Sequence, residues 1–266
     1  MRASRQTPWG YALAAMVRGL AVTVAGLLAA GASASDLTVF AAASLRDLLI
    51  EVSKDWADAT GYEATISVAG SPLIARQISL GAPADVVILA SSDWMDQLAA
   101  EGRLIPGSRF DWLGNDLVLI AADADASAEP IDGRLDLNAR LGQGRFAMAN
   151  THSVPAGIYG RAALEHFGLW SHVSDRLAEA ENVRAALAWV ATGIAPLGVV
   201  YGTDARADPR VAVIGTFPPE SHAPIAYPAA AVAHGNSALA DRFLQFLRRP
   251  EVARTARDHG FLPVGG

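Results

Sequence analysis

The stretch LTVFAAASLRDLLIEVSKDWADATGYEATISVA (37–69) indicates the fold class of this 266-residue chain. It begins with a short apolar run, 37–43, which is typical of a buried strand. Gly61 is suited to end a helix over 44–61, and a second strand is expected at 63–69. Within 44–61, apolar residues recur at helical spacing at Leu45, Leu48, Leu49, Val52 and Trp56. A strand, a helix and a strand joined by short connections predict a parallel α/β unit with a right-handed crossover.

The same alternation continues through the rest of the chain. Further helices are expected at 71–81, 92–102, 154–168, 181–193 and 237–260, the last of them interrupted at Pro250. Further strands are expected at 84–90, 115–122, 144–150, 196–202, 210–217 and 225–233. These elements form two clusters, and we expect the tail after residue 227 to return to the first cluster. The prediction is an α/β fold of two lobes, residues 35–114 plus 228–266 and residues 115–227. Each lobe is expected to hold a mixed, mostly parallel sheet flanked by helices, with a hinged cleft between the lobes for a small ligand.

Residues 1–34 have the features of a secretory signal peptide. Three arginines accompany an apolar run, 19–30, and the segment ends in Ala32-Ser33-Ala34, a small-x-small cleavage pattern. The apolar run is short for a bilayer span, so we expect cleavage rather than an uncleaved anchor. The mature protein is therefore expected in the periplasm, and no cysteine is present to carry a lipid anchor.

The composition argues against several classes of function. The chain is 52% hydrophobic and 18% charged, which is typical of a globular protein. Loss of residues 1–34, which carry three arginines and no acid, takes the net charge from −6 to −9. So acidic a chain is not expected to bind nucleic acid or an anionic membrane surface. With no cysteine, disulfides, thiolate metal sites and cysteine nucleophiles are excluded.

Two serines precede expected helices in the first cluster. In VAGSPLIARQI (68–78), a serine stands before a proline and an amphipathic run. Ser71 is therefore expected to cap this helix, with Pro72 as its first residue. Ser44 is expected to cap the N-terminus of the helix over 44–61, with Asp47 three residues later completing an imperfect capping box.

Helix starts from both clusters together predict a binding site. Ser44, Ser71, Ala156 and Val183 each lie at or within one turn of an expected helix start, two in each cluster. Helix N-termini offer unpaired N–H groups and about half a positive charge, so they attract anions. In parallel α/β lobes, the helices that follow strands begin at the sheet edge where ligands collect. With the phenol of Tyr201 at a strand end, these residues would surround a small anion with neutral donors.

A site made only of donors restricts the ligand. Monohydrogen phosphate carries an O–H group that needs an acceptor, and leaving that group unpaired costs about 1–3 kcal/mol. The expected ligand is therefore a tetrahedral dianion without protons, such as sulfate, molybdate, tungstate or chromate. The size of the pocket would then select among these anions.

Six stretches carry a resemblance to a known family: VFAAASLRDLL, GSPLIARQISLGAPADVVILAS, WMDQL, VPAGIYGRAAL, ENVRAALAWV and PLGVVYGTDA. In this order and spacing the chain resembles the periplasmic molybdate-binding proteins of ABC transporters, the ModA type, over nearly its whole mature length. The resemblance implies a type II periplasmic-binding-protein fold that captures molybdate, and also tungstate, for a membrane permease. It implies neither an enzymatic activity nor a cofactor, and we expect a monomer.

Carried over by motif, the resemblance assigns molybdate binding to Ser44, Ser71, Ala156, Val183 and Tyr201. The serines and the tyrosine would donate their hydroxyls, and the alanine and the valine their backbone N–H groups. In GSPL this chain departs from the Ser/Thr-rich version usual in the family. Because Pro72 has no N–H, any family contact from that amide is absent here.

Other interpretations of the same residues remain open. Singly, Ser44 and Ser71 are ordinary caps, and Tyr201 is an ordinary half-buried residue. A secreted serine hydrolase would need a G-x-S-x-G elbow, which is absent, and of the six histidines only His152 lies near the expected cleft. A zinc enzyme is disfavoured because no H-E-x-x-H motif occurs. A binding protein for an amino acid or a sugar could use the aromatic side chains of Trp94, Trp112, Trp170 and Trp189.

Charged residues near the helix starts are not assigned to the ligand. Three arginines are expected to point to solvent, namely Arg46, Arg76 and Arg184. Three acids are interpreted as caps or turn formers, namely Asp47, Asp85 and Asp204. An acid aimed into the cleft would repel the expected dianion.

Overall fold

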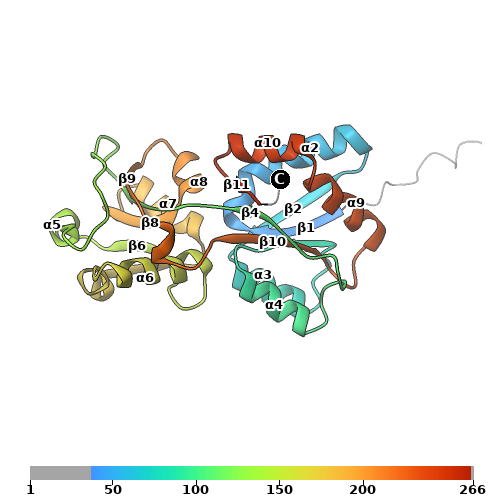
Figure 1. Cartoon of the computed structure of the whole chain (residues 1–266), viewed down its shortest axis with the longest axis horizontal. Coiled ribbons are helices and arrows are strands. Elements are labelled where there is room, and N and C mark those ends of the chain that lie inside the picture. Colours follow the sequence, from blue (N-terminus) through green and yellow to red (C-terminus); the bar gives the residue numbers. More distant parts are fainter. Residues whose placement is uncertain (1–36, 265–266) are drawn as a thin grey trace, which may run out of the picture. The chain divides into compact units, whose positions relative to one another are not determined.

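Two β-sheets organise the part of the chain that the computed structural model describes, residues 37–264 (Figure 1). These residues belong to one compact unit. The predicted signal peptide, 1–34, lies outside the described residues. Within 37–264, no helix has the length and apolar character needed to cross a membrane.

The first sheet has six strands in the order β11-β4-β10-β3-β1-β2. They are β1 Leu37–Ala42, β2 Ala64–Ala69, β3 Val86–Ile88, β4 Phe110–Gly114, β10 Ala226–Ala231 and β11 Leu262–Pro263. Strand β1 runs parallel to β2 and β3. Strand β10 is antiparallel to β3 and β4, and β11 is antiparallel to β4.

The second sheet has five strands in the order β7-β6-β8-β5-β9. They are β5 Leu117–Ala121, β6 Phe146–Ala149, β7 Leu177–Ala180, β8 Leu197–Tyr201 and β9 Ala212–Thr216. Strand β6 runs parallel to β7 and β8, whereas β5 is antiparallel to β8 and β9.

Both sheets are mixed, as predicted, and most strands of each sheet run in the same direction. The parallel pairs are confined to the βαβ units, β1 with β2 and β3 and β6 with β7 and β8. Strand β4 leads the chain from the first sheet towards β5, and β10 brings it back. These two strands therefore run in opposite directions and pair antiparallel, which a local reading of helix and strand patterns does not reveal.

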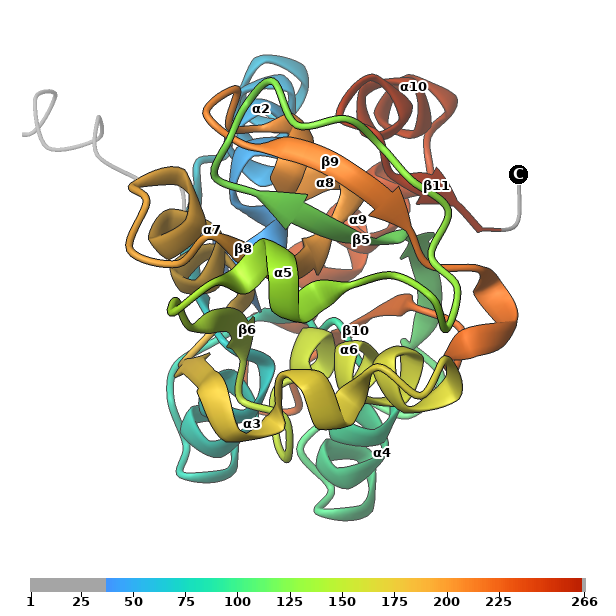
Figure 2. The same ribbon diagram turned by 90° about the vertical axis from the view of Figure 1, so that its left-hand side faces the viewer.

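Helices cover both faces of each sheet. They are α2 Arg46–Thr60, α3 Ser71–Ser79, α4 Ser92–Ala100, α5 Leu137–Leu141, α6 Pro155–His166, α7 Val183–Ala191, α8 Gly202–Arg206, α9 Ser237–Leu247 and α10 Pro250–Asp258. Figure 1 shows α2, α9 and α10 on one side of the first sheet and α3 and α4 on the other. Figure 2 looks towards the second sheet, with α6 on one side of it and α8 on the other.

The first sheet is buried on both faces. Along β3, Val86 and Ile88 belong to one buried cluster and Val87 to a second, as expected where alternate side chains point to opposite faces. The tail joins the first of these clusters, because Phe243 of α9 packs edge-on against Trp56 of α2 with ring centroids 5.3 Å apart. The tail therefore packs against the elements of the first sheet.

Candidate functional site

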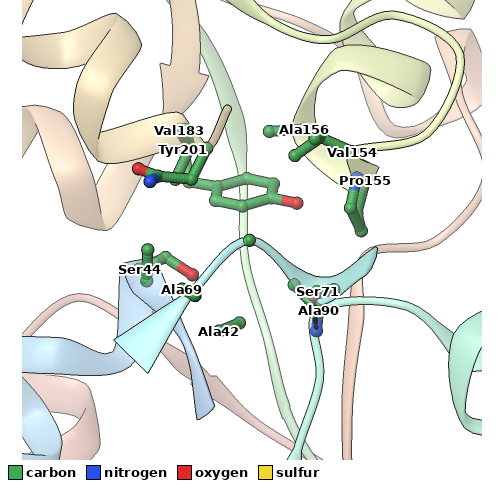
Figure 3. A pocket seen from close by; sticks show the side chains of 13 residues that line it. Ala42, Ser44, Ala69, Ser71, Ala90, Val154, Pro155, Ala156, Val183 and Tyr201 are labelled. Carbon is green, nitrogen blue, oxygen red and sulfur yellow. Dashed lines mark hydrogen bonds between the residues drawn. The ribbon is translucent and has the colours of Figure 1, made fainter. Parts of the chain in front are cut away.

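A small cavity lies where the helices that follow β1, β2, β6 and β7 begin. Its volume is about 10 Å³. The five predicted site residues all line it, together with Ala42, Ala43, Ala69, Gly70, Ala90, Val154, Pro155 and Asn182 (Figure 3). None of these lining side chains carries a formal charge, so the wall consists of small apolar groups, hydroxyls, an amide and the starts of helices.

Ser71 is the first residue of α3, and Gly70 is its N-cap residue. The expectation that Ser71 caps the helix is therefore wrong by one position, and Pro72 is the second helical residue. The Ser71 hydroxyl makes no cap hydrogen bond; its Oγ accepts from the backbone N–H of Ala90 at 3.1 Å. An N–H group can only donate, so the hydroxyl hydrogen of Ser71 stays available for another acceptor.

Ser44 lies in a 3₁₀ turn, Ala43–Leu45, that leads into α2. It is not a cap, and the expected capping box with Asp47 does not form, because no side chain caps this turn or α2. Instead, Ser44 Oγ lies 3.0 Å from the hydroxyl oxygen of Tyr227 in β10. This pair could not be predicted from local sequence patterns, because 183 residues separate the two positions.

Ala156 and Val183 contribute backbone N–H groups from the second half of the site. Ala156 is the second residue of α6 and Val183 the first of α7, so neither amide has a partner within its helix. Asn182 caps α7 as predicted, its Oδ1 accepting from the backbone N–H of Ala185 at 3.0 Å. This cap satisfies the amide of Ala185 and leaves that of Val183, a residue of the cavity wall, without a partner within the helix.

The phenol of Tyr201 is the most informative group in the cavity. Tyr201 is the last residue of β8 and is 1% exposed. Its hydroxyl is buried and has no hydrogen-bond partner among the described residues. In Figure 3 the ring crosses the cavity and its hydroxyl lies towards Pro155. Burial raises its pKa well above the ordinary value, so this hydroxyl remains a neutral donor.

The two halves of the site approach each other closely beside the cavity. A Cβ atom added to Gly70 would lie 2.5 Å from the backbone carbonyl oxygen of Glu181. Nearby, Trp94 Nε1 of α4 donates to the carbonyl oxygen of Ser153 at 3.0 Å. Glycine is therefore required at position 70 for this arrangement.

An ion cluster lies just outside the cavity wall. Arg184 of α7 pairs through Nε with Asp204 Oδ1 at 2.5 Å and through Nη2 with Asp47 Oδ2 at 2.7 Å. Asp204 is fully buried, whereas the Asp47 side chain is 42% exposed. The expectations that Arg184 points to solvent and that Asp47 and Asp204 are caps or turn formers are therefore wrong. The guanidinium of Arg184 is paired with these two carboxylates, and Arg184 does not line the cavity.

Other residues considered from the sequence take structural roles or lie away from the cavity. Asp85 accepts from the backbone N–H groups of Thr38, at 2.7 Å, and Asn236, at 2.6 Å, so it links distant segments instead of forming the expected cap or local turn. His152 does not line the cavity, and neither serine has a histidine as its hydrogen-bond partner. The four tryptophans considered as stacking platforms are also absent from its wall.

Asp204 makes the stability depend on pH. Burial raises the pKa of its carboxyl from 3.8 to about 6, although Arg184 acts in the opposite direction. The folded state therefore holds this proton more tightly than the unfolded state. It follows that the contribution of Asp204 to the free energy of unfolding falls as the pH rises from about 4 to about 6 and is constant above that range.

We predict that Asp204→Asn removes this dependence. Between pH 4 and pH 7, the free energy of unfolding of the wild type should fall by about 2–3 kcal/mol relative to that of the variant. Urea unfolding of both proteins at several pH values measures the difference, in which the titration of other groups cancels. Parallel pH profiles for the two proteins would contradict the prediction.

The chain was also compared with known proteins. A model of bacterial extracellular solute-binding proteins matches residues 37–262. The molybdate-binding protein ModA of Escherichia coli is 40% identical over 85% of this chain and 88% of its own length. The solved periplasmic molybdate-binding protein of Azotobacter vinelandii superposes with a TM-score of 0.74 at 27% identity, covering 85% of this chain and 99% of that one. A Pseudomonas protein named aconitate isomerase is 26% identical over 89% of this chain and 91% of its own length.

Proposed function

Since the chain belongs to the bacterial extracellular solute-binding protein family, we propose that it captures molybdate or tungstate in the cavity and delivers it to an ABC permease. One observation carries the choice of ligand. Within residues 37–264, the Tyr201 hydroxyl is buried without a partner in a cavity whose lining carries no formal charge. A buried hydroxyl without a partner costs about 1–3 kcal/mol, and an anion oxygen that accepts its hydrogen removes this cost.

The donors in the cavity favour a fully deprotonated oxyanion. Ser71 has a hydroxyl hydrogen to give, because its oxygen already accepts from a backbone N–H. The amides of Ala156 and Val183 and the phenol of Tyr201 add further donors. A protonated oxyanion such as monohydrogen phosphate would need one of these hydroxyls to accept its O–H hydrogen, so that hydroxyl could no longer donate to the anion, which favours an anion without protons. We propose Ser44, Ser71, Ala156, Val183 and Tyr201 as the ligand-binding residues.

The size of the cavity favours a compact ligand. A volume of about 10 Å³ is close to the space that one enclosed water needs. A tetrahedral oxyanion, with four oxygens around one centre, requires modest outward shifts of the lining. An amino acid, a sugar or a tricarboxylate would require the two halves to part widely. The relationship to the molybdate-binding protein of Escherichia coli supports molybdate among the tetrahedral anions.

We propose that binding closes a hinge between two lobes, residues 35–114 plus 228–266 and residues 115–227. Ser44 and Ser71 belong to the first, and Ala156, Val183 and Tyr201 to the second. Only the closed arrangement supplies all of these donors, so the anion shifts the population towards it. The closed shape then identifies the loaded protein to the permease, and no covalent step or cofactor is involved.

The cellular setting is part of the same proposal. Cleavage after residue 34 would release an acidic, monomeric protein into the periplasm. Its partners are the small oxyanion and the permease, not nucleic acid. The aconitate isomerase name of one relative raises catalysis as an alternative, but no acid or base lines the cavity to move a proton.

A melting experiment on the dialysed mature protein tests this function. We expect molybdate and tungstate to raise the melting temperature in a concentration-dependent way, as ligands of the folded state do. Phosphate and aconitate should leave it unchanged, and Ser71→Ala should need more molybdate for the same shift. A shift with sulfate alone would reassign the ligand to sulfate, and no shift with any metal oxyanion would overturn the proposal.

A further inference from the structure

We propose that Asn115 and Tyr227 are positioning residues that turn the hydroxyl hydrogen of Ser44 towards the bound oxyanion. This inference rests on the proposed function and extends it to residues outside the cavity wall. It follows from which group must donate and which must accept in each hydrogen bond of one buried network of side chains. This network joins the side chains of Thr203, Asn115, Tyr227 and Ser44.

The direction begins at the amide of Asn115, which is buried. Its Oδ1 accepts from the backbone N–H of Asp116 at 3.0 Å, and this contact fixes which end of the amide faces which way. The Nδ2 group therefore faces two hydroxyl oxygens, Thr203 Oγ1 at 2.8 Å and Tyr227 Oη at 3.1 Å. An amide nitrogen has two hydrogens and can only donate, so both of its hydrogens are used.

The second step is the phenol of Tyr227, which is 0% exposed. Its oxygen accepts a hydrogen from Asn115, and its remaining partner among the described residues is Ser44 Oγ at 3.0 Å. If Ser44 donated to this phenol, the phenol hydrogen would be left without an acceptor in a buried position, which is unfavourable. Tyr227 therefore donates to Ser44.

The third step is Ser44 itself, which is 2% exposed and lines the cavity. Because its oxygen accepts from Tyr227, its own hydrogen is free to turn into the cavity. The hydroxyl hydrogen of Ser71 is free for the same reason, but its oxygen accepts from the backbone N–H of Ala90, which a change of the Ala90 side chain to another non-proline residue would keep. The hydroxyl of Ser44 is oriented by the side chains of Tyr227 and Asn115, so its role as a donor can be changed by mutation.

The positions of these side chains connect the site to the crossings between the sheets. Asn115 lies between β4 and β5, and Tyr227 lies in β10, the strand that returns the chain to the first sheet. Thr203 lies in α8, which follows the strand that ends in Tyr201. The orientation of Ser44 is therefore set where the chain passes between the two halves of the site.

A double-mutant cycle on molybdate affinity tests the first part of the inference. Tyr227→Phe removes the hydroxyl and keeps the ring, and we expect it to weaken molybdate binding about fivefold to tenfold in the wild type. In a Ser44→Ala background the same change should have less than about a twofold effect, because Tyr227 acts through Ser44. In a Ser71→Ala background, which serves as the matched control, it should keep its full effect.

A selectivity measurement tests the direction itself. Asn115→Asp is nearly isosteric but can only accept, so it would take the Tyr227 hydrogen and make that phenol accept from Ser44. Ser44 would then present a lone pair, and the ratio of molybdate to monohydrogen-phosphate affinity should fall about tenfold or more. The added negative charge weakens the binding of both dianions to a similar extent, so its effect cancels in the ratio of the two affinities. The ratio is measured at pH 8, where phosphate is mostly the monohydrogen form.

The outcomes separate this inference from the proposed function. If the wild type binds no molybdate, the function is overturned and the inference with it. If it binds molybdate, but Tyr227→Phe has equal effects in all three backgrounds or Asn115→Asp leaves the anion ratio unchanged, the positioning role alone is overturned.

Discussion

Gly70→Ala is expected to weaken molybdate binding by about 5-fold to 150-fold. The added Cβ would lie 2.5 Å from the carbonyl oxygen of Glu181, a backbone atom that cannot swing aside. Overpacking of this kind costs about 1–3 kcal/mol, and relief requires the two halves of the site to separate. The free energy of unfolding should change little, because the separated arrangement relieves the clash. Calorimetric titration and urea unfolding measure the two quantities.

Gly202→Ala is the matched control for this prediction. Gly202 is the first residue of α8, as Gly70 precedes the first residue of α3. A Cβ added to Gly202 would meet its nearest atom, Asp116 Cβ, at 3.7 Å, which is an ordinary contact. We expect this variant to bind molybdate as the wild type does. Equal affinities of Gly70→Ala and the wild type would show that the close approach is not needed for binding.

Tyr201→Phe is expected to change affinity and stability in opposite directions. The ligand loses a hydrogen bond to a charged acceptor, which should weaken molybdate binding by about 2 kcal/mol, or roughly 30-fold. In the ligand-free protein, the substitution removes a buried hydroxyl that has no partner in the part of the chain that the structure describes. The free energy of unfolding without ligand should therefore stay the same or rise by about 1 kcal/mol.

Tyr62→Phe provides the control for the loss of a phenol hydroxyl. Tyr62 stacks on Trp56, with ring centroids 6.4 Å apart, and does not line the cavity. Its substitution should leave molybdate affinity unchanged. If Tyr201→Phe also leaves affinity unchanged, or if it destabilises the ligand-free protein as a lost hydrogen bond would, then the phenol is not a ligand donor.

Much of the fold follows from local patterns in the sequence. The alternation in 37–69 gave β1, α2 and β2, because apolar spacing and helix-ending glycines are local signals. The antiparallel pairing of β10 was not predicted, and β4 and β11 were not expected as strands. A strand's partner depends on where the chain returns from, and β10 pairs with β4, which lies more than a hundred residues earlier. Periodicity within one segment carries no information on such a pairing.

The residues around the cavity were predicted better than their hydrogen bonds. Ser44 and Ser71 were expected there because helices start near them, and both line the cavity. Their expected capping roles failed because partners distant in sequence occupy their oxygens, Tyr227 for Ser44 and Ala90 for Ser71. Arg184 was misjudged for the same reason, since both of its carboxylate partners come from other elements.

The central claim is that neutral donors from two halves of one site enclose an oxyanion that carries no proton. Isothermal titration of the dialysed protein at pH 7.5, in two buffers with different heats of ionisation, tests it most directly. We expect one molybdate per chain, the same enthalpy in both buffers because no proton is exchanged, and far weaker binding of phosphate than of molybdate. Proton uptake with molybdate, or phosphate binding as tight as that of molybdate, would contradict the claim.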